Sequence, residues 1–408
     1  MTVTLPRDWH LFGPGPKRIL ALDGGGVRGA ISIGYLERLE KQIEDIAGKP
    51  IPLCDWFDVI GGTSTGAIIA CALALGYRAS DIRDRYKVLG PRVFRRPFYR
   101  LSGIQAKFDA RSLIHELFEI YGDRTLDSED LRTGFAVVTK RLDSGSSWIV
   151  ANNPRAQFWE TPADASFIGN RHYRLVDLVR ASSAAPYFFD PQPISIAAEM
   201  PPGVFVDGAL TPHNNPSLYM FLLATLPQFG LRWPIGPDNL TIVSVGTGSS
   251  YLHTMTMRDA RWTRALGIAV HSLASLMSDS RQFVLALMSW LGESPMAWKI
   301  NSELGDLSAV PPPHGQPLFR FLRYDVALEA DWLRDHLGLP LDTKTVMSYR
   351  RLDAPENIPA LHELGARAAE QQLSDRILSA HSKRHAVDRI RPRACMRTTA
   401  SPETGGIR

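Results

Sequence analysis

A serine flanked by glycines is the part of the sequence best suited to nucleophilic chemistry. The run Gly62-Thr63-Ser64-Thr65-Gly66 follows an apolar stretch at 56–60, which predicts a strand, and precedes one at 67–76, which predicts a buried helix. A tight strand-to-helix turn presents the serine Oγ at a helix N-terminus, where the dipole and unpaired N–H groups favour negative charge. We therefore predict that Ser64 is a nucleophile and that the Thr65 N–H faces the reacting oxygen. The alternative is a glycine-rich turn with an incidental serine.

Three consecutive glycines follow the first predicted strand, in the run Asp23-Gly24-Gly25-Gly26-Val27-Arg28-Gly29. The spacing of Gly24, Gly26 and Gly29 allows a dinucleotide-binding interpretation. Against that interpretation, the Asp23 carboxylate would repel a pyrophosphate, and the expected acidic partner falls inside a predicted helix, at Glu40 or Glu44. Consecutive glycines also let several N–H groups converge on one point. We favour this second interpretation, in which the loop stabilises the oxyanion formed when Ser64 attacks an ester carbonyl.

The run Asp207-Gly208-Ala209 ends a strand predicted at 203–206 and supplies a candidate base. An Asp-Gly pair alone is most simply a turn cap, but beside the other two motifs we predict that Asp207 pairs with Ser64. A free aspartate has a pKa of about 3.9 and is a weak base, so we expect burial to raise the pKa of Asp207. The alternative is an esterase with a Ser–Asp–His triad of the α/β-hydrolase kind, with His213 or His253 as the base.

Taken together, these motifs resemble the patatin-like phospholipase family. The segments that carry the resemblance are DGGGVRG (23–29), GTSTG (62–66), ASSAAPYFF (181–189), DGA (207–209) and HNNP (213–216). The resemblance covers roughly residues 18–250.

The resemblance implies a lipid acyl hydrolase of the phospholipase A type that uses a Ser–Asp dyad and an acyl-enzyme, with no cofactor and no metal. Ser64 is then the nucleophile and Asp207 the base, and the substrate is an acyl ester of a phospholipid or neutral lipid. The implied oxyanion hole consists of Gly24, Gly25, Gly26, Arg28 and Thr65, and the remaining motif positions are Gly29, Gly62, Gly66, Gly208 and Ala209. Many family members have Gly at the position of Ala209, and we expect the small methyl group to be tolerated. Arg28 either neutralises charge at the loop or braces it. The alternative function is that of a regulated lipid-binding effector.

Strand–glycine–helix units at the start of the chain predict an α/β fold with a parallel sheet. The predicted strands are 18–23, 56–60, 134–139, 148–151, 203–206 and 240–245, and the predicted helices are 30–46, 67–76, 175–183, 262–271, 272–291 and 356–382. The family resemblance implies a patatin-like three-layer α/β/α arrangement with a mainly parallel central sheet. We divide the chain into a loose lead-in (1–17), a patatin-like domain (18–250), a helical C-terminal extension (251–382) and a disordered basic tail (383–408).

Composition narrows the class of protein. The 408 residues carry 46 basic and 42 acidic side chains, a net charge of +4 that gives no sign of nucleic-acid binding. Cys54, Cys71 and Cys395 form no CxxC pair, which argues against a structural zinc site and suits a reducing compartment. The N-terminal residues show no signal-peptide pattern, and the longest apolar stretch, 67–75, is too short to span a bilayer. We therefore expect a cytoplasmic protein.

Residues 88–101 interleave arginines with Phe94, Phe98 and Tyr99. Basic and aromatic side chains together suit an anionic membrane surface, so peripheral membrane contact is one prediction for this segment. In the alternative, its aromatic side chains pack inward and its arginines are solvated.

Overall fold

The computed structural model describes residues 5–94, 106–250, 265–296, 298–307 and 309–373. The tail predicted at 383–408 therefore lies outside the described residues. None of the described helices combines the length and the apolar character that crossing a bilayer requires.

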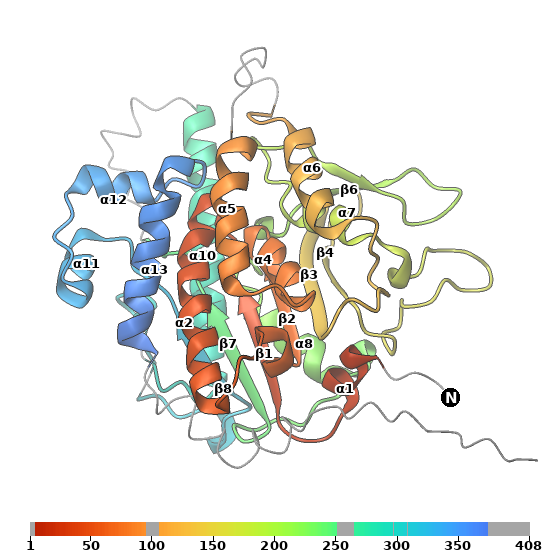
Figure 1. Ribbon diagram of the computed structural model, residues 1–408, viewed down its shortest axis with the longest axis horizontal. Coiled ribbons are helices and arrows are strands. Elements are labelled where there is room, and N and C mark those ends of the chain that lie inside the picture. The colour runs from red at the N-terminus through yellow and green to blue at the C-terminus, as the bar shows by residue number, and fades with distance from the viewer. Residues whose placement is uncertain (1–4, 95–105, 251–264, 297, 308, 374–408) are drawn as a thin grey trace, which may run out of the picture.

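One eight-stranded sheet forms the centre of the described structure (Figure 1). Its strand order is β5-β6-β3-β2-β1-β7-β8, and β4 also pairs with β3. The strands are β1 (Lys17–Leu22), β2 (Val59–Thr63), β3 (Gly134–Arg141), β4 (Ser147–Ala151), β5 (Gln192–Ile194), β6 (Gly203–Asp207), β7 (Leu240–Val245) and β8 (Arg320–Tyr324). The ladder from β3 through β2, β1 and β7 to β8 is parallel, whereas β4 and β6 run antiparallel to β3. The predicted mainly parallel α/β fold is thus confirmed.

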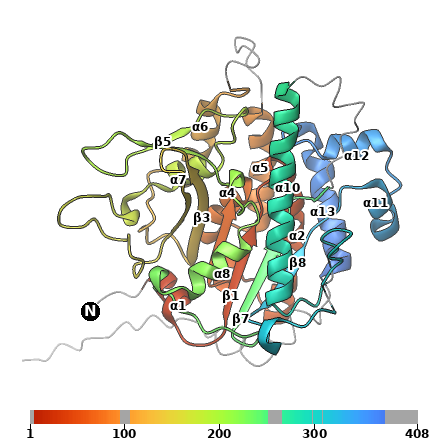
Figure 2. The same ribbon diagram turned by 180° about the vertical axis from the view of Figure 1, so that it is seen from behind.

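Successive side chains of each strand point to opposite faces of the sheet, and helices cover both faces. Leu20 and Leu22 of β1 pack into one core with α2, α4, α5, α6, α7 and α13, while Ile19 and Ala21 pack into a second core with α1, α8 and α10. Figures 1 and 2 show these two layers from opposite sides. The longer helices are α1 (Pro6–Phe12), α2 (Gly29–Ala47), α4 (Thr65–Ala74), α5 (Ala79–Val93), α6 (Ala110–Tyr121), α7 (Leu175–Ser182), α8 (Ser217–Thr225), α10 (Ala265–Leu291), α11 (Ala330–Leu337), α12 (Thr343–Tyr349) and α13 (Ile358–Gln372).

Within the predicted loose lead-in over 1–17, the described residues 5–17 are ordered and packed, which corrects that part of the prediction. Pro6 begins α1, where its missing N–H costs nothing. Leu11 is buried in the second core, and Lys17 already belongs to β1. The expected strand at 56–60 is also shifted: Trp56 ends the short helix α3 (Leu53–Trp56), and β2 begins at Val59.

The C-terminal region contributes to the sheet as well as to the helices. The sequence predicted no strand after residue 245, yet β8 pairs in parallel with β7. The two helices predicted at 262–271 and 272–291 are one helix, α10, from Ala265, and residues 262–264 lie outside the described part. Of the helix predicted at 356–382, Ile358–Gln372 is observed as α13, which packs along α2, and residues 374–382 lie outside the described part.

Candidate active site

Ser64 lies in the turn between β2 and α4, in an unusual backbone conformation. Its φ is 55° and its ψ −124°, a region that side-chain-bearing residues seldom occupy. The Ser64 N–H donates to Ser182 Oγ at 2.8 Å, and Ser182 Oγ donates to the Val138 carbonyl at 2.6 Å. These two hydrogen bonds hold the strained residue between α7 and β3.

Gly62 and Gly66 make the turn sterically feasible. A Cβ added at Gly62 would overlap the backbone of Gly66, and one added at Gly66 would overlap the carbonyl of Leu22 on β1. The predicted glycine–serine–glycine turn therefore exists, and each flanking glycine is required for close backbone packing.

Strand register brings Asp207 to Ser64. Thr63 pairs with Val138 across β2 and β3, and the next residue of β3, Thr139, pairs with Asp207 at the end of β6. Ser64 is thus level with Asp207, and its Oγ donates to Asp207 Oδ2 at 2.7 Å. Both residues are buried.

The surroundings of Asp207 favour its protonated form more than water does. Burial raises the pKa of Asp207 to about 6, although hydrogen bonds from the Ala209 N–H and the Ser64 hydroxyl and the charge of Arg180 act in the opposite direction. The Ala209 N–H donates to Asp207 Oδ1 at 2.8 Å, and Gly208 begins the short helical turn that brings this donor back to the carboxylate. Ala209 is buried, and its methyl group does not prevent this hydrogen bond. The carboxylate is therefore a stronger base than a free aspartate.

Of the two histidines of the alternative triad, His213 is described, and its ring makes no hydrogen bond to Ser64 or Asp207 in the described structure. The ring of His213 packs on Tyr219, with ring centroids 4.3 Å apart, and burial lowers its pKa to about 4. The His213 carbonyl accepts a hydrogen bond from the Thr63 hydroxyl, so this residue supports the turn through its backbone. His253 lies outside the described residues.

Comparison with known protein families assigns about the first half of the chain to a family. Residues 20–221 match the sequence model of the family described as "Patatin-like phospholipase". This segment is a patatin-like phospholipase domain. The resemblance predicted from the sequence motifs is thereby confirmed.

Two curated relatives extend the match beyond the family model. The chain is 29% identical over 256 residues to "Patatin-like protein 1" of Arabidopsis thaliana, covering 57% of this chain and 59% of that protein. It is 32% identical over 249 residues to the "cGAMP-activated phospholipase" of Vibrio cholerae, covering 57% of this chain and 65% of that protein. This chain thus spans less than two thirds of the length of these two relatives. Among solved structures, human GIVD cytosolic phospholipase A2 aligns with a TM-score of 0.44 and 12% identity, over 92% of this chain and 60% of that one.

The glycine loop of the patatin-like domain lies directly beside the nucleophile. A Cβ added at Gly24 would lie 3.0 Å from the Ser64 Cβ. The Gly24 N–H donates to the Asn214 carbonyl at 3.1 Å, so this predicted oxyanion donor is already occupied. For the N–H groups of Gly25, Gly26 and Thr65, the described residues supply no hydrogen-bond acceptor.

Arg28 and Tyr86 flank the glycine loop. Arg28 ends the turn Gly26–Arg28 and Gly29 begins α2. Burial lowers the pKa of Arg28 to about 10, and its Nε is a buried donor for which the described residues supply no acceptor. Tyr86 of α5 donates its hydroxyl to the Gly26 carbonyl at 2.5 Å and shares a 2.9 Å hydrogen bond with the Thr65 hydroxyl. Tyr86 thus connects the loop to the start of α4.

Three residues that hold the nucleophile and the loop had no predicted role: Ser182, Tyr86 and Asn214. Ser182 and Asn214 lie in the ASSAAPYFF and HNNP segments, so their motifs were visible but their backbone partners were not. Tyr86 carried no signal, because a tyrosine within a predicted helix is most often a core residue. Within the described residues, no group of three or more His, Cys, Asp or Glu side chains could hold a metal ion.

Only part of the predicted membrane-contact segment, 88–101, is described. The Phe94 ring packs edge-on against Phe108 with centroids 5.4 Å apart, and Arg92 forms an ion pair with Glu116 at 2.8 Å. Phe94 and Arg92 therefore agree with the alternative in which the aromatic side chains pack inward and the arginines are solvated. Residues 95–101 lie outside the described part, so peripheral membrane contact remains a prediction.

Proposed function

We propose that this protein is a lipid acyl hydrolase that cleaves acyl esters of phospholipids or neutral lipids with Ser64 and Asp207 as its catalytic dyad. The observation that carries the proposal is the buried 2.7 Å hydrogen bond from Ser64 Oγ to Asp207 Oδ2, at the start of a helix and beside a glycine loop. The patatin-like domain supports the same chemistry.

In the first half of the reaction, Ser64 Oγ attacks the ester carbonyl carbon while its proton passes to Asp207 Oδ2. The tetrahedral intermediate then collapses: the carbon–oxygen bond to the alcohol breaks, and Asp207 returns the proton to the leaving alkoxide. In the second half, water attacks the acyl-enzyme, Asp207 accepts its proton, and Ser64 recovers that proton as the fatty acid leaves.

The oxyanion of both tetrahedral intermediates is stabilised by the N–H groups of Gly25, Gly26 and Thr65. Thr65 directly follows the nucleophile, and Gly25 and Gly26 follow Gly24, whose added Cβ would lie 3.0 Å from the Ser64 Cβ. Among the described residues these three N–H groups have no acceptor to give up when the oxyanion forms. Loss of a single such donor typically lowers kcat by about 10²–10³-fold. Gly24 has a different role in this scheme, because its N–H anchors the loop to Asn214.

The test is hydrolysis of a p-nitrophenyl acyl ester and of phospholipid vesicles by the purified protein and by Ser64→Ala. We expect Ser64→Ala to lose at least about 10³-fold in kcat, since loss of a hydrolase nucleophile costs up to about 10⁶-fold. Ser183→Ala is the matched control, because this buried hydroxyl donates to the Val179 carbonyl and touches neither Ser64 nor Asp207. As one relative is named a cGAMP-activated phospholipase, each assay is run with and without that nucleotide.

Reaction with a fluorophosphonate probe separates this proposal from the lipid-binding effector. A hydrolase is labelled at Ser64 and turns over ester, whereas an effector captures lipid vesicles without labelling or turnover. Full turnover by Ser64→Ala would show that the dyad is not the catalyst.

A further inference from the structure

A buried arginine from the C-terminal region contacts the residue that begins the glycine loop. Arg323 of β8 donates from Nη1 to Asp23 Oδ1 at 2.9 Å and from Nη2 to Asp23 Oδ2 at 2.6 Å. Both side chains are almost fully buried, with 3% exposed in each case. This two-point contact fixes the plane of the carboxylate as well as its distance.

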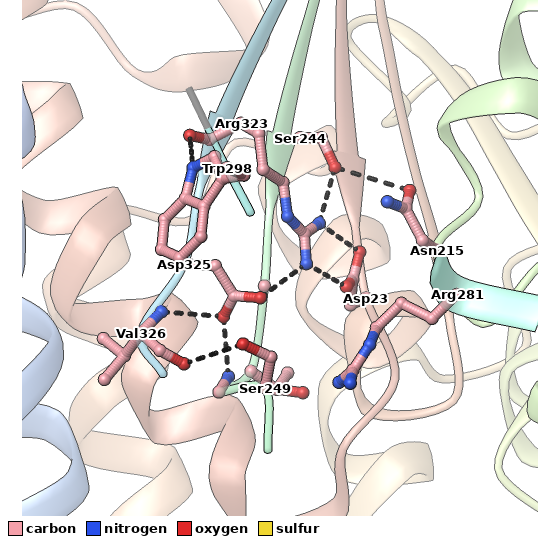
Figure 3. A network of polar contacts seen from close by, with 12 residues as sticks. Asp23, Asn215, Ser244, Ser249, Arg281, Trp298, Arg323, Asp325 and Val326 are labelled. Carbon is pink, nitrogen blue, oxygen red and sulfur yellow. Dashed lines mark hydrogen bonds and ion pairs between the residues drawn. The ribbon is translucent and has the colours of Figure 1, made fainter. Parts of the chain in front are cut away.

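The Arg323 guanidinium is itself held by other fixed groups (Figure 3). Its Nη2 lies 2.7 Å from Asp325 Oδ2, and its Nη1 donates to Ser244 Oγ of β7 at 2.7 Å. Asp325 Oδ1 accepts the N–H groups of Gly248 and Val326, each at 2.9 Å. The arginine therefore has little freedom to change its orientation relative to β7 and β8.

The glycine loop has further anchors in the same part of the chain. The Gly24 carbonyl accepts the Thr247 hydroxyl at 2.8 Å, and the Val27 N–H donates to the Leu352 carbonyl at 2.9 Å. Arg323, Thr247 and Leu352 all lie after residue 221, where the match to the family model ends. The loop is thus held from outside the matched domain as well as from within it, where Asn214 and Tyr86 contact it.

We propose that Arg323 is a positioning residue for the glycine loop: through Asp23 it holds the N–H groups of Gly25 and Gly26 where they meet the oxyanion. This inference rests on the proposed hydrolase function. Oxyanion donors act because they are already oriented when charge develops, and a displacement of about 1 Å can cost on the order of 10²-fold in rate. Lysine cannot replace arginine here, because a single ammonium group cannot contact both carboxylate oxygens in one plane.

The experiment compares Arg323→Lys with the parent protein, using active-site concentrations titrated with a fluorophosphonate. We expect kcat for a p-nitrophenyl ester to fall between about tenfold and 10²-fold per titrated site while KM changes less than threefold. The inhibition constant of a trifluoromethyl ketone, whose adduct places an oxyanion at the same point, should rise by the same factor as kcat/KM falls. Arg320→Lys is the matched control on the same strand, since Arg320 pairs with Glu293 away from the loop.

A purely structural role for Arg323 would lower the fraction of titratable sites but leave kcat and the ketone inhibition constant per site unchanged, and this result overturns the inference. If Arg323→Lys does not fold, Ser244→Ala provides the same comparison, because it removes one contact of the guanidinium and leaves both ion pairs. A smaller loss in the same two quantities is then expected, and no loss overturns the inference. A parent protein that neither hydrolyses ester nor reacts with the fluorophosphonate overturns the proposed function as well, whereas an active parent with an unchanged variant overturns only the role of Arg323.

Discussion

In the proposed mechanism a carboxylate acts without a histidine, so it has to gain basicity from its surroundings. Asp207 does so through burial, which raises its pKa to about 6, while the Ala209 N–H keeps one oxygen occupied and leaves the other for Ser64. A stronger base is useful at neutral pH only if it is still ionised there, and a pKa near 6 satisfies both conditions.

This balance predicts the pH dependence of the reaction. Asp207 accepts a proton only in its ionised form, so kcat/KM should fall tenfold per pH unit below pH 6 and level off above about pH 7. The measurement is kcat/KM for a soluble ester from pH 4.5 to 8.5. His213→Gln is the control: because its imidazole does not contact the dyad, we expect the same acid limb with and without it. An acid limb that disappears in His213→Gln would identify a histidine base instead.

Ionisation of Asp207 also affects stability. Its folded pKa is raised above the unfolded value near 3.8, so the carboxyl group favours folding below that value and this contribution is lost as pH rises through about 6. Asp207→Asn keeps an oxygen for the Ala209 N–H and carries no charge. We therefore expect its melting temperature, relative to that of the parent, to rise between pH 5 and pH 8 in thermal unfolding followed by circular dichroism. A difference that stays constant with pH would contradict the raised pKa.

At the scale of secondary-structure elements, helices contribute side chains to the site that the strands do not. The end of α7 supplies Ser182 to the Ser64 N–H, and α5 supplies Tyr86 to the glycine loop and to Thr65. The turn and the loop therefore depend on how these helices pack on the sheet.

Tyr86→Phe tests this dependence. The variant removes the hydroxyl that joins Gly26 to Thr65, so we expect a loss of stability of about 1 kcal/mol and a roughly tenfold lower kcat. Tyr121→Phe is the matched control, since its buried hydroxyl donates to the Ile68 carbonyl of α4 and does not reach the loop. Chemical denaturation should give similar losses for both variants, and ester hydrolysis should fall only in Tyr86→Phe. Equal kcat values in the two variants would show that Tyr86 does not position the loop.

The elements differ in how well the sequence predicts them. The strand at 240–245 was predicted with its observed limits, because an apolar run between polar ends suits a strand buried on both faces. β8 was missed because its sequence, RFLRY, carries two arginines, and only the structure shows that Asp23 and Asp325 neutralise Arg323. The two motifs that give Ser64 and Asp207 were recognisable because glycines mark tight turns, but their 2.7 Å contact depends on the register of three strands, which local patterns do not encode.

At the scale of the whole molecule, the C-terminal region completes the fold around the patatin-like domain. α13 packs along α2, and Tyr35 of α2 donates its hydroxyl to the Asp325 carbonyl at 2.7 Å. The two helices approach closely at Gly34 and Gly365, where an added Cβ would press on the backbone of the other helix. Residues 320–373 are therefore part of the same packed unit as the site.

Gly365→Ala is predicted to push α13 away from α2. The new methyl group would meet the backbone of Ile31, and overpacking of this kind costs about 1–3 kcal/mol. Glu363→Ala on the exposed side of α13 is the control and should change stability by less than about 0.5 kcal/mol. The free energy of unfolding from urea titration measures both. Equal stabilities for the two variants would mean that the helices can separate without loss.

The parallel pairing of β7 with β8 also has an evolutionary consequence. Ser244 and Arg323 fasten the adjoining ends of these two strands. In the chain between them, Thr247 holds the Gly24 carbonyl, Gly248 holds Asp325, and Val284 and Met288 of α10 are buried in the second core, so descendants can vary this connection only between these anchors. In natural lineages or in a laboratory library, variation that keeps these anchors should therefore preserve folding better than replacement of the whole connection.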